Sequence, residues 1–106
     1  NNTSGALNTA TGVNALIVSN GDDNTADGVS SLVNNTSGSQ NTAVGSGALY
    51  DNTIGVGNTA IGYLAGVNAP GNYSNATAIG YQARANTGNK IRLGNSTVTV
   101  IEGQPP

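Results

Sequence analysis

The segment Asn-Thr-Ala-(Ile/Val)-Gly recurs along this 106-residue chain at nearly constant intervals. Its threonine occupies positions 9, 25, 42, 59 and 77, which are 16, 17, 17 and 18 residues apart. Self-similarity at a short, fixed period is typical of repeat architectures, in which each repeat packs only against its neighbours. The repeat therefore constrains the fold more than any other feature, and it predicts a stack of short coils.

The residue types within each repeat favour extended backbone over helix. Gly, Asn, Thr and β-branched residues are poor helix formers, and no 3.6-residue periodicity runs through the array. A second short extended piece is expected after each motif, as at residues 13–16 and 46–49, and turns are expected between repeats, as at residues 34–38 and 68–72. We predict an all-β fold, a parallel β-roll or β-solenoid.

Strand alternation places Thr59 and Ile61 on one face, and Ala60 and Gly62 on the other. We expect stacking to bury the apolar row inside the coil, with the threonines beside it and with a glycine that permits the bend. Asp27 replaces the apolar residue in the second copy, so we expect a local register change toward solvent or a hydrated cavity. The expected structural ladder consists of Val44, Ile61 and Ile79, of Thr42, Thr59 and Thr77, and of Gly45, Gly62 and Gly80.

Large side chains are scarce, because hydrophobic residues make up 36% of the chain and Phe, Trp, Met and Cys are absent. A coil of this composition encloses little side-chain volume, so we expect partner chains to complete the core. A threefold arrangement with the Ile/Val edges at a shared axis uses one interface three times and closes on itself. The sequence therefore predicts a homotrimer.

Several functional classes are excluded by charge and residue type. Three Lys and Arg against five Asp and Glu leave no basic surface for nucleic acid, and no apolar run reaches the length needed for membrane insertion. Without His or Cys, the usual nucleophilic and metal chemistry is missing. We expect neither an enzyme nor a cofactor, and we interpret the acidic cluster Asp22, Asp23 and Asp27 as a solvated turn rather than a calcium site.

The aromatic side chains are the candidate ligand contacts, because exposed aromatic rings can stack against sugars. The alternative is that they pack over turns or across a trimer seam. These residues are Tyr50, Tyr63, Tyr73 and Tyr81. Arg84, Lys90 and Arg92 are expected to make surface or inter-chain polar contacts.

Residues 75–83 resemble the Asn-Ser-Val-Ala-Ile-Gly repeat of trimeric autotransporter adhesin heads, with Thr in place of the usual Val. Residues 41–62 resemble the longer head-like repeats of bacterial and phage-type fibre proteins. Residues 89–103 are similar to the segment that precedes an endosialidase-type intramolecular chaperone in such fibres. The resemblance implies a left-handed β-roll in each of three chains, with head-like repeats over 1–88 and a C-terminal strand or neck over 89–106 that leads to a downstream region.

By this resemblance the chain is a structural display segment of an extracellular trimeric fibre, on a bacterial surface or a phage-like particle. Its expected partners are its own copies and a surface glycan or matrix protein. Two alternatives stay open: a filament subunit that stacks end to end, and an ice-binding β-solenoid. The expected inward placement of the threonine row argues against ice binding.

Overall fold

The computed structural model describes residues 4–69 and 72–103, so Pro70 and Gly71 of the expected turn lie outside the described residues. Within the described residues the regular elements are all β-strands, and the prediction of an all-β solenoid is confirmed. The strands are β1 (Thr9–Thr11), β2 (Thr25–Asp27), β3 (Thr42–Val44), β4 (Thr59–Ile61), β5 (Gly66–Val67), β6 (Thr77–Ile79), β7 (Arg84–Ala85) and β8 (Ile91–Leu93).

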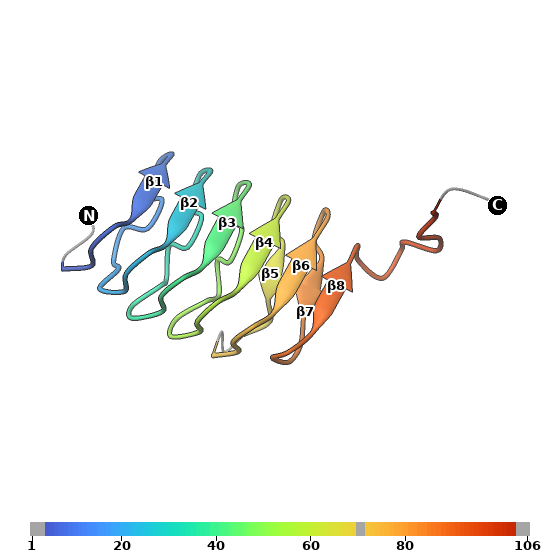
Figure 1. The fold of residues 1–106 in the computed structure, drawn as a ribbon. Coiled ribbons are helices and arrows are strands. Elements are labelled where there is room, and N and C mark those ends of the chain that lie inside the picture. The colour runs from blue at the N-terminus through green and yellow to red at the C-terminus, as the bar shows by residue number, and fades with distance from the viewer. Residues whose placement is uncertain (1–3, 70–71, 104–106) are drawn as a thin grey trace.

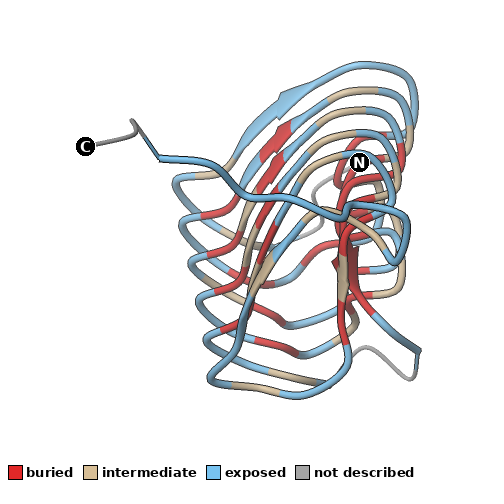
Figure 2. Ribbon diagram, turned by 90° about the vertical axis from the view of Figure 1, so that its right-hand side faces the viewer, coloured by how far each residue is buried: buried red, intermediate tan, exposed pale blue. Residues whose placement is uncertain are grey.

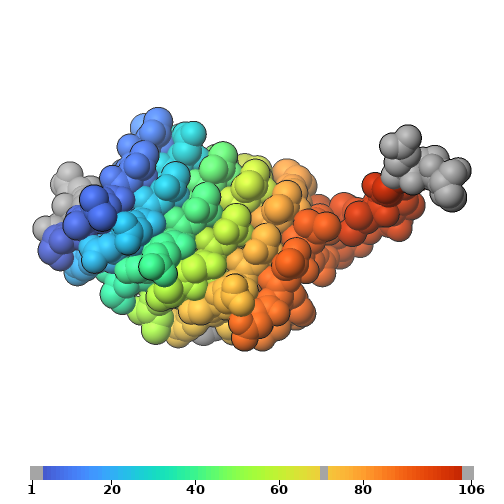
Figure 3. Space-filling model, viewed as in Figure 1, coloured from blue at the N-terminus to red at the C-terminus, as the bar shows by residue number. Residues whose placement is uncertain are grey.

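Six of these strands form one parallel sheet that runs the length of the solenoid in the order β1-β2-β3-β4-β6-β8 (Figure 1). Equivalent residues of successive repeats lie side by side, so that Thr42 pairs with Thr59 and Val44 pairs with Ile61. The molecule measures 50 × 24 × 23 Å, and its long dimension includes the segment that leaves the sheet after β8. Its coils appear as oblique bands in the space-filling view (Figure 3).

The second piece of each early repeat is a turn, and the expectation of a second strand there is wrong. The N–H groups of Ala15, Ser31 and Ala48 donate to the carbonyl three residues earlier. The leucine that follows each of them, at positions 16, 32 and 49, has a positive φ of 50 to 52°. A left-handed backbone at this point turns the chain back toward the sheet. A second, two-stranded parallel sheet forms only later, between β5 and β7.

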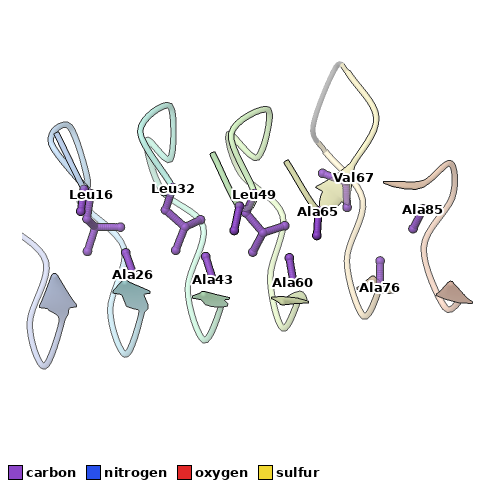
Figure 4. Close-up of a cluster of buried hydrophobic side chains, with 12 residues drawn as sticks. Leu16, Ala26, Leu32, Ala43, Leu49, Ala60, Ala65, Val67, Ala76 and Ala85 are labelled. Carbon is purple, nitrogen blue, oxygen red and sulfur yellow. The ribbon is translucent and has the colours of Figure 1, made fainter. Parts of the chain in front are cut away.

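The core consists of small side chains from the strands and of the leucines from the turns. The central alanine of β2, β3, β4 and β6 is at most 1% exposed, and so are Leu16, Leu32 and Leu49. Figure 4 shows the leucines and the strand alanines facing one another across the coil, and Figure 2 shows the buried residues along the inner side of the ribbon. The apolar core is therefore a narrow stack made mostly of Ala and Leu.

The prediction that Val44, Ile61 and Ile79 are buried inside the coil is wrong. Because these residues are two positions from Thr and one from Ala, they point away from the buried alanines. They are 37 to 43% exposed on the outer face of the sheet. The physical reason is space: the coil is so narrow that alanine fills the inner strand position, and a larger side chain fits only outside.

The glycine of each motif permits both the bend and the close approach of successive coils. Gly45, Gly62 and Gly80 have φ values of 123, 130 and 120°. A Cβ atom on Gly45 would lie 2.7 Å from the carbonyl oxygen of Gly62 in the next coil. A side chain at this position would therefore meet backbone that cannot move without separating the coils.

The last strand, β8, stacks on β6 with Ile91 beside Thr77, although only 14 residues separate those two positions (91 − 77). The strand expected within 89–106 is thus an additional rung of the main sheet. Residues 96–103 then leave the solenoid and are exposed, as the pale trace toward the C-terminus in Figure 2 shows.

Candidate functional site: the outward face of the six-stranded sheet

The outward face carries two parallel rows of side chains, which we call the threonine row and the apolar row. Thr42, Thr59 and Thr77 form the half-buried part of the threonine row, which begins with the exposed Thr9 and Thr25. The apolar row is made by Val44, Ile61, Ile79 and Leu93, all exposed. Adjacent rungs of a parallel sheet lie about 4.8 Å apart, so both rows are close to continuous.

The apolar row begins with two polar residues, and neither disturbs the register. Asp27 pairs with Thr11 on one side and Val44 on the other. Its carboxylate reaches solvent because the whole row faces outward. The expected register change or hydrated cavity at Asp27 is therefore wrong. That expectation assumed that the apolar row faces the inside of the coil, whereas the row faces outward.

The four tyrosines do not gather at one place. Tyr63 and Tyr81 lie in adjacent coils, are 48 and 60% exposed, and stack with ring centroids 5.6 Å apart at an interplanar angle of 16°. Tyr50 is exposed by itself, whereas Tyr73 is half-buried and packs against the core. Only the Tyr63–Tyr81 pair offers an extended aromatic surface.

A row of inward-facing asparagines joins the coils from inside. Its members are buried except for the half-buried Asn8, and no role was predicted for them from the sequence. The Oδ1 atoms of Asn8, Asn24 and Asn41 accept the backbone N–H of the next asparagine in the row at 2.8, 3.0 and 2.9 Å. The Oδ1 atom of Asn58 accepts the N–H of Ala76 at 2.9 Å. We call Asn8, Asn24, Asn41 and Asn58 the asparagine row.

The other end of each amide also bonds into the following coil. The Nδ2 atom of Asn41 donates to the carbonyl of Gly55 at 2.8 Å, and Asn24 donates to Gly38 at 2.9 Å. Each amide thus accepts from one backbone N–H and donates to one backbone carbonyl of the following coil, so it satisfies polar backbone groups inside the small core. The signal was present in the motif, whose first residue is Asn in four of the five copies.

In the later repeats, the position equivalent to the turn leucine is occupied first by Gly66 and then by Arg84. These two residues pair in the two-stranded sheet. The guanidinium of Arg84 forms a half-buried ion pair with Asp51 and donates to the carbonyl of Val67 at 2.7 Å. This ion pair ties together coils that are 33 residues apart in the sequence. Of the three cationic residues expected at the surface, Arg84 is therefore a structural contact.

The acidic cluster is not assembled into a metal site. Asp22 accepts the backbone N–H of Ala6 at 2.7 Å, and Asp27 lies in the apolar row. Residues 4–69 and 72–103 contain no group of three or more side chains arranged to hold a metal ion. In the same residues, no helix has the length and apolar character needed to cross a bilayer.

Comparison with known proteins returned no match among protein-family models, curated protein sequences or solved structures.

Proposed function

We propose that this chain is a structural display segment of an extracellular homotrimeric fibre, in which a left-handed β-roll from each of three chains packs through the outward face of its six-stranded sheet. The fibre holds turns and aromatic side chains in a stiff, repeated array. Weak contacts with a surface glycan or matrix protein then add through effective concentration. The Tyr63–Tyr81 pair is the aromatic surface best placed for such contacts.

The observation that carries this proposal is the uncovered apolar row. Val44, Ile61, Ile79 and Leu93 form an unbroken line of exposed aliphatic side chains over the last four rungs of the main sheet. The interior of the coil is already filled by Ala and Leu, so these side chains have no place in the chain's own core. Contiguous exposed apolar surface of this kind is typical of protein–protein interfaces.

Threefold self-association suits this row for two reasons. An identical row on each chain, brought to a shared axis, buries all three at once and leaves no free apolar face. The resemblance of residues 75–83 to trimeric autotransporter adhesin heads supports the same arrangement and an extracellular location.

The test is the variant Ile61→Asp, examined by sedimentation equilibrium. Asp27 already occupies the same row in the second coil, so the coil accepts a carboxylate there. At a trimer axis three unpaired carboxylates would be desolvated together, at a cost of several kcal/mol per ion. We expect the wild-type chain to sediment at three times the mass of one chain, and the variant to sediment as a folded monomer.

The matched control is Ile54→Asp, because Ile54 is 51% exposed but lies outside the six-stranded sheet. The control should remain trimeric. A wild-type chain that sediments as a folded monomer, or an Ile61→Asp variant that stays trimeric, would contradict the proposed interface.

Ice binding is a second candidate, and one observation favours it: the threonine row faces outward beside the apolar row. The argument against ice binding assumed that the threonines face inward, so it no longer applies. A parallel sheet with Thr and Val or Ile repeating at the rung spacing presents methyl and hydroxyl groups at regular intervals. A trimer would cover this same face, so the two functions exclude each other.

Thermal hysteresis decides between them. Ice binding requires measurable hysteresis in the wild-type chain and its loss in Thr59→Tyr, which would place a bulky ring on the row. Ser37→Tyr, at an exposed position outside the sheet, is the control. Absence of hysteresis in the wild-type chain would eliminate this candidate.

A further inference from the structure

The main sheet extends one rung further than the two-stranded sheet, and a cavity lies beside this extra rung. The main sheet continues to β8, whereas the two-stranded sheet stops at β7. The cavity has a volume of about 580 Å³ and is lined by side chains of both strands and by the chain that leaves β8. This volume lies within the usual range of small-molecule sites. We call it the step cavity.

Positive charge is concentrated at the step cavity, although the whole chain has a net charge of −2. Arg84 and Arg92 line the cavity, and the Nζ atom of Lys90 lies 2.7 Å from Oδ1 of Asn86, another lining residue. These are all three of the chain's Lys and Arg residues. Asp51, paired with Arg84, is the acidic group in contact with them, so the local charge is 3 − 1 = +2.

Arg92 is the cation available to a ligand. Its Nε donates to the carbonyl of Gly94 at 2.8 Å, which anchors the guanidinium beside the cavity. Within the described residues its two terminal nitrogens have no protein partner. By contrast, Arg84 is engaged by Asp51, by Asn68 and by the carbonyl of Val67. An anionic group would therefore lie against the terminal nitrogens of Arg92.

Three asparagines add hydrogen-bond donors, because internal partners occupy their oxygens. Oδ1 of Asn68 accepts Nε–H of Arg84 at 3.2 Å, Oδ1 of Asn86 accepts the ammonium of Lys90, and Oδ1 of Asn95 accepts the N–H of Thr97 at 2.9 Å. These partners are all donors, so they determine which end of each amide carries the oxygen. Each asparagine is left with its Nδ2 hydrogens for a ligand.

We propose that the step cavity binds a carboxylated mono- or disaccharide. The carboxylate pairs with the terminal nitrogens of Arg92, a charge-assisted contact, and the hydroxyl and ring oxygens accept from the asparagine amides. A bare oxyanion would use only part of this donor set, whereas a sugar supplies acceptor oxygens over the whole volume. The site is built within one chain and does not rest on the trimer.

The test titrates the full 106-residue chain, isotopically labelled, with D-glucuronic acid, D-glucose and inorganic phosphate, and follows backbone amide signals by NMR. Glucuronic acid and glucose differ only at the sixth carbon, so their comparison isolates the carboxylate. We expect glucuronic acid to shift the signals of residues 82–97 and to bind at least about tenfold more tightly than either other compound. Added NaCl should weaken that binding.

Two variants and one control locate the site. Arg92→Gln removes the available cation, and Asn86→Asp replaces a donor with a carboxylate of the same shape while keeping the partner of Lys90. Each should lower the affinity for glucuronic acid at least about tenfold. Ser37→Asp makes the same change in net charge as Arg92→Gln at a remote exposed position, and it should leave the affinity unchanged.

The proposal is overturned if glucuronic acid shifts no signal in 82–97, if glucose or phosphate binds equally well, or if Ser37→Asp weakens binding as much as Arg92→Gln. Sedimentation of the same samples reports the oligomeric state separately. A failure of the sugar site is thereby distinguished from a failure of the trimer.

Discussion

Truncation of one buried asparagine should destabilise the array far more than its small size suggests. In Asn41→Ala, the buried N–H of Asn58 loses its acceptor. An unsatisfied buried backbone group costs about 1–3 kcal/mol. The carbonyl of Gly55 loses one donor but keeps the amide of Asn52 at 3.2 Å, so that loss is about 0.5–1.5 kcal/mol. Together these losses should lower the free energy of unfolding by about 1.5–4.5 kcal/mol.

Urea denaturation followed by far-ultraviolet circular dichroism measures this change. All samples must share one protein concentration, because self-association would stabilise the folded state by mass action. The matched control is Asn34→Ala. Asn34 is exposed and makes one hydrogen bond, to the carbonyl of Tyr50 at 2.8 Å. Its truncation should change the free energy of unfolding by less than about 1 kcal/mol.

The reasoning is refuted if Asn41→Ala unfolds at the same urea concentration as the wild-type chain. It is also refuted if Asn34→Ala is equally destabilised, because the cost would then come from losing any asparagine rather than from orphaning buried backbone. An Asn41→Ala chain too unstable to purify can be examined at lower temperature in a stabilising osmolyte, where the order of the two variants must be the same.

Two further predictions concern the packing of the coils. Gly45→Ala should lower the free energy of unfolding by more than about 2 kcal/mol, because the new methyl group would lie 2.7 Å from the backbone of Gly62. The control is Gly57→Ala, which has open space around it and should cost about 1 kcal/mol from its positive φ alone. Leu32→Ala should cost about 2–5 kcal/mol, because Leu32 is fully buried and the coil has few other large side chains to close the cavity. Thermal unfolding monitored by circular dichroism checks both, and a Gly57→Ala variant as damaged as Gly45→Ala would contradict the first.

The stacking of the repeats was predictable, whereas the direction in which their faces point was not. Strand alternation correctly assigns Ala60 to one face of the sheet and its neighbours Thr59 and Ile61 to the other, because successive side chains of a strand point to opposite faces. Hydrophobicity then favours Ile as the inward residue. That choice fails because the leucines of the turns already fill the narrow coil, so the inner strand position has room only for the methyl group of Ala60.

The asparagine row was not predicted because a single asparagine is usually exposed rather than buried. The sequence shows that Asn precedes Thr in four of the five copies, as Asn41 precedes Thr42, but it does not show that the side chain turns inward to bond the next coil. The step cavity was equally hidden, since Arg84 and Arg92 meet only because β7 and β8 end two different sheets. Both features depend on how coils stack rather than on any one repeat.

The asparagine row also gives the array a direction of growth. Each side chain in it presents its oxygen and its amide hydrogens to the coil that follows in the sequence. A nascent chain emerging from the ribosome would therefore meet, in its last folded coil, a ready pattern of donors and acceptors for the next one. Coils can then be added one at a time in the order of synthesis, because each one bonds mainly to the coil that precedes it.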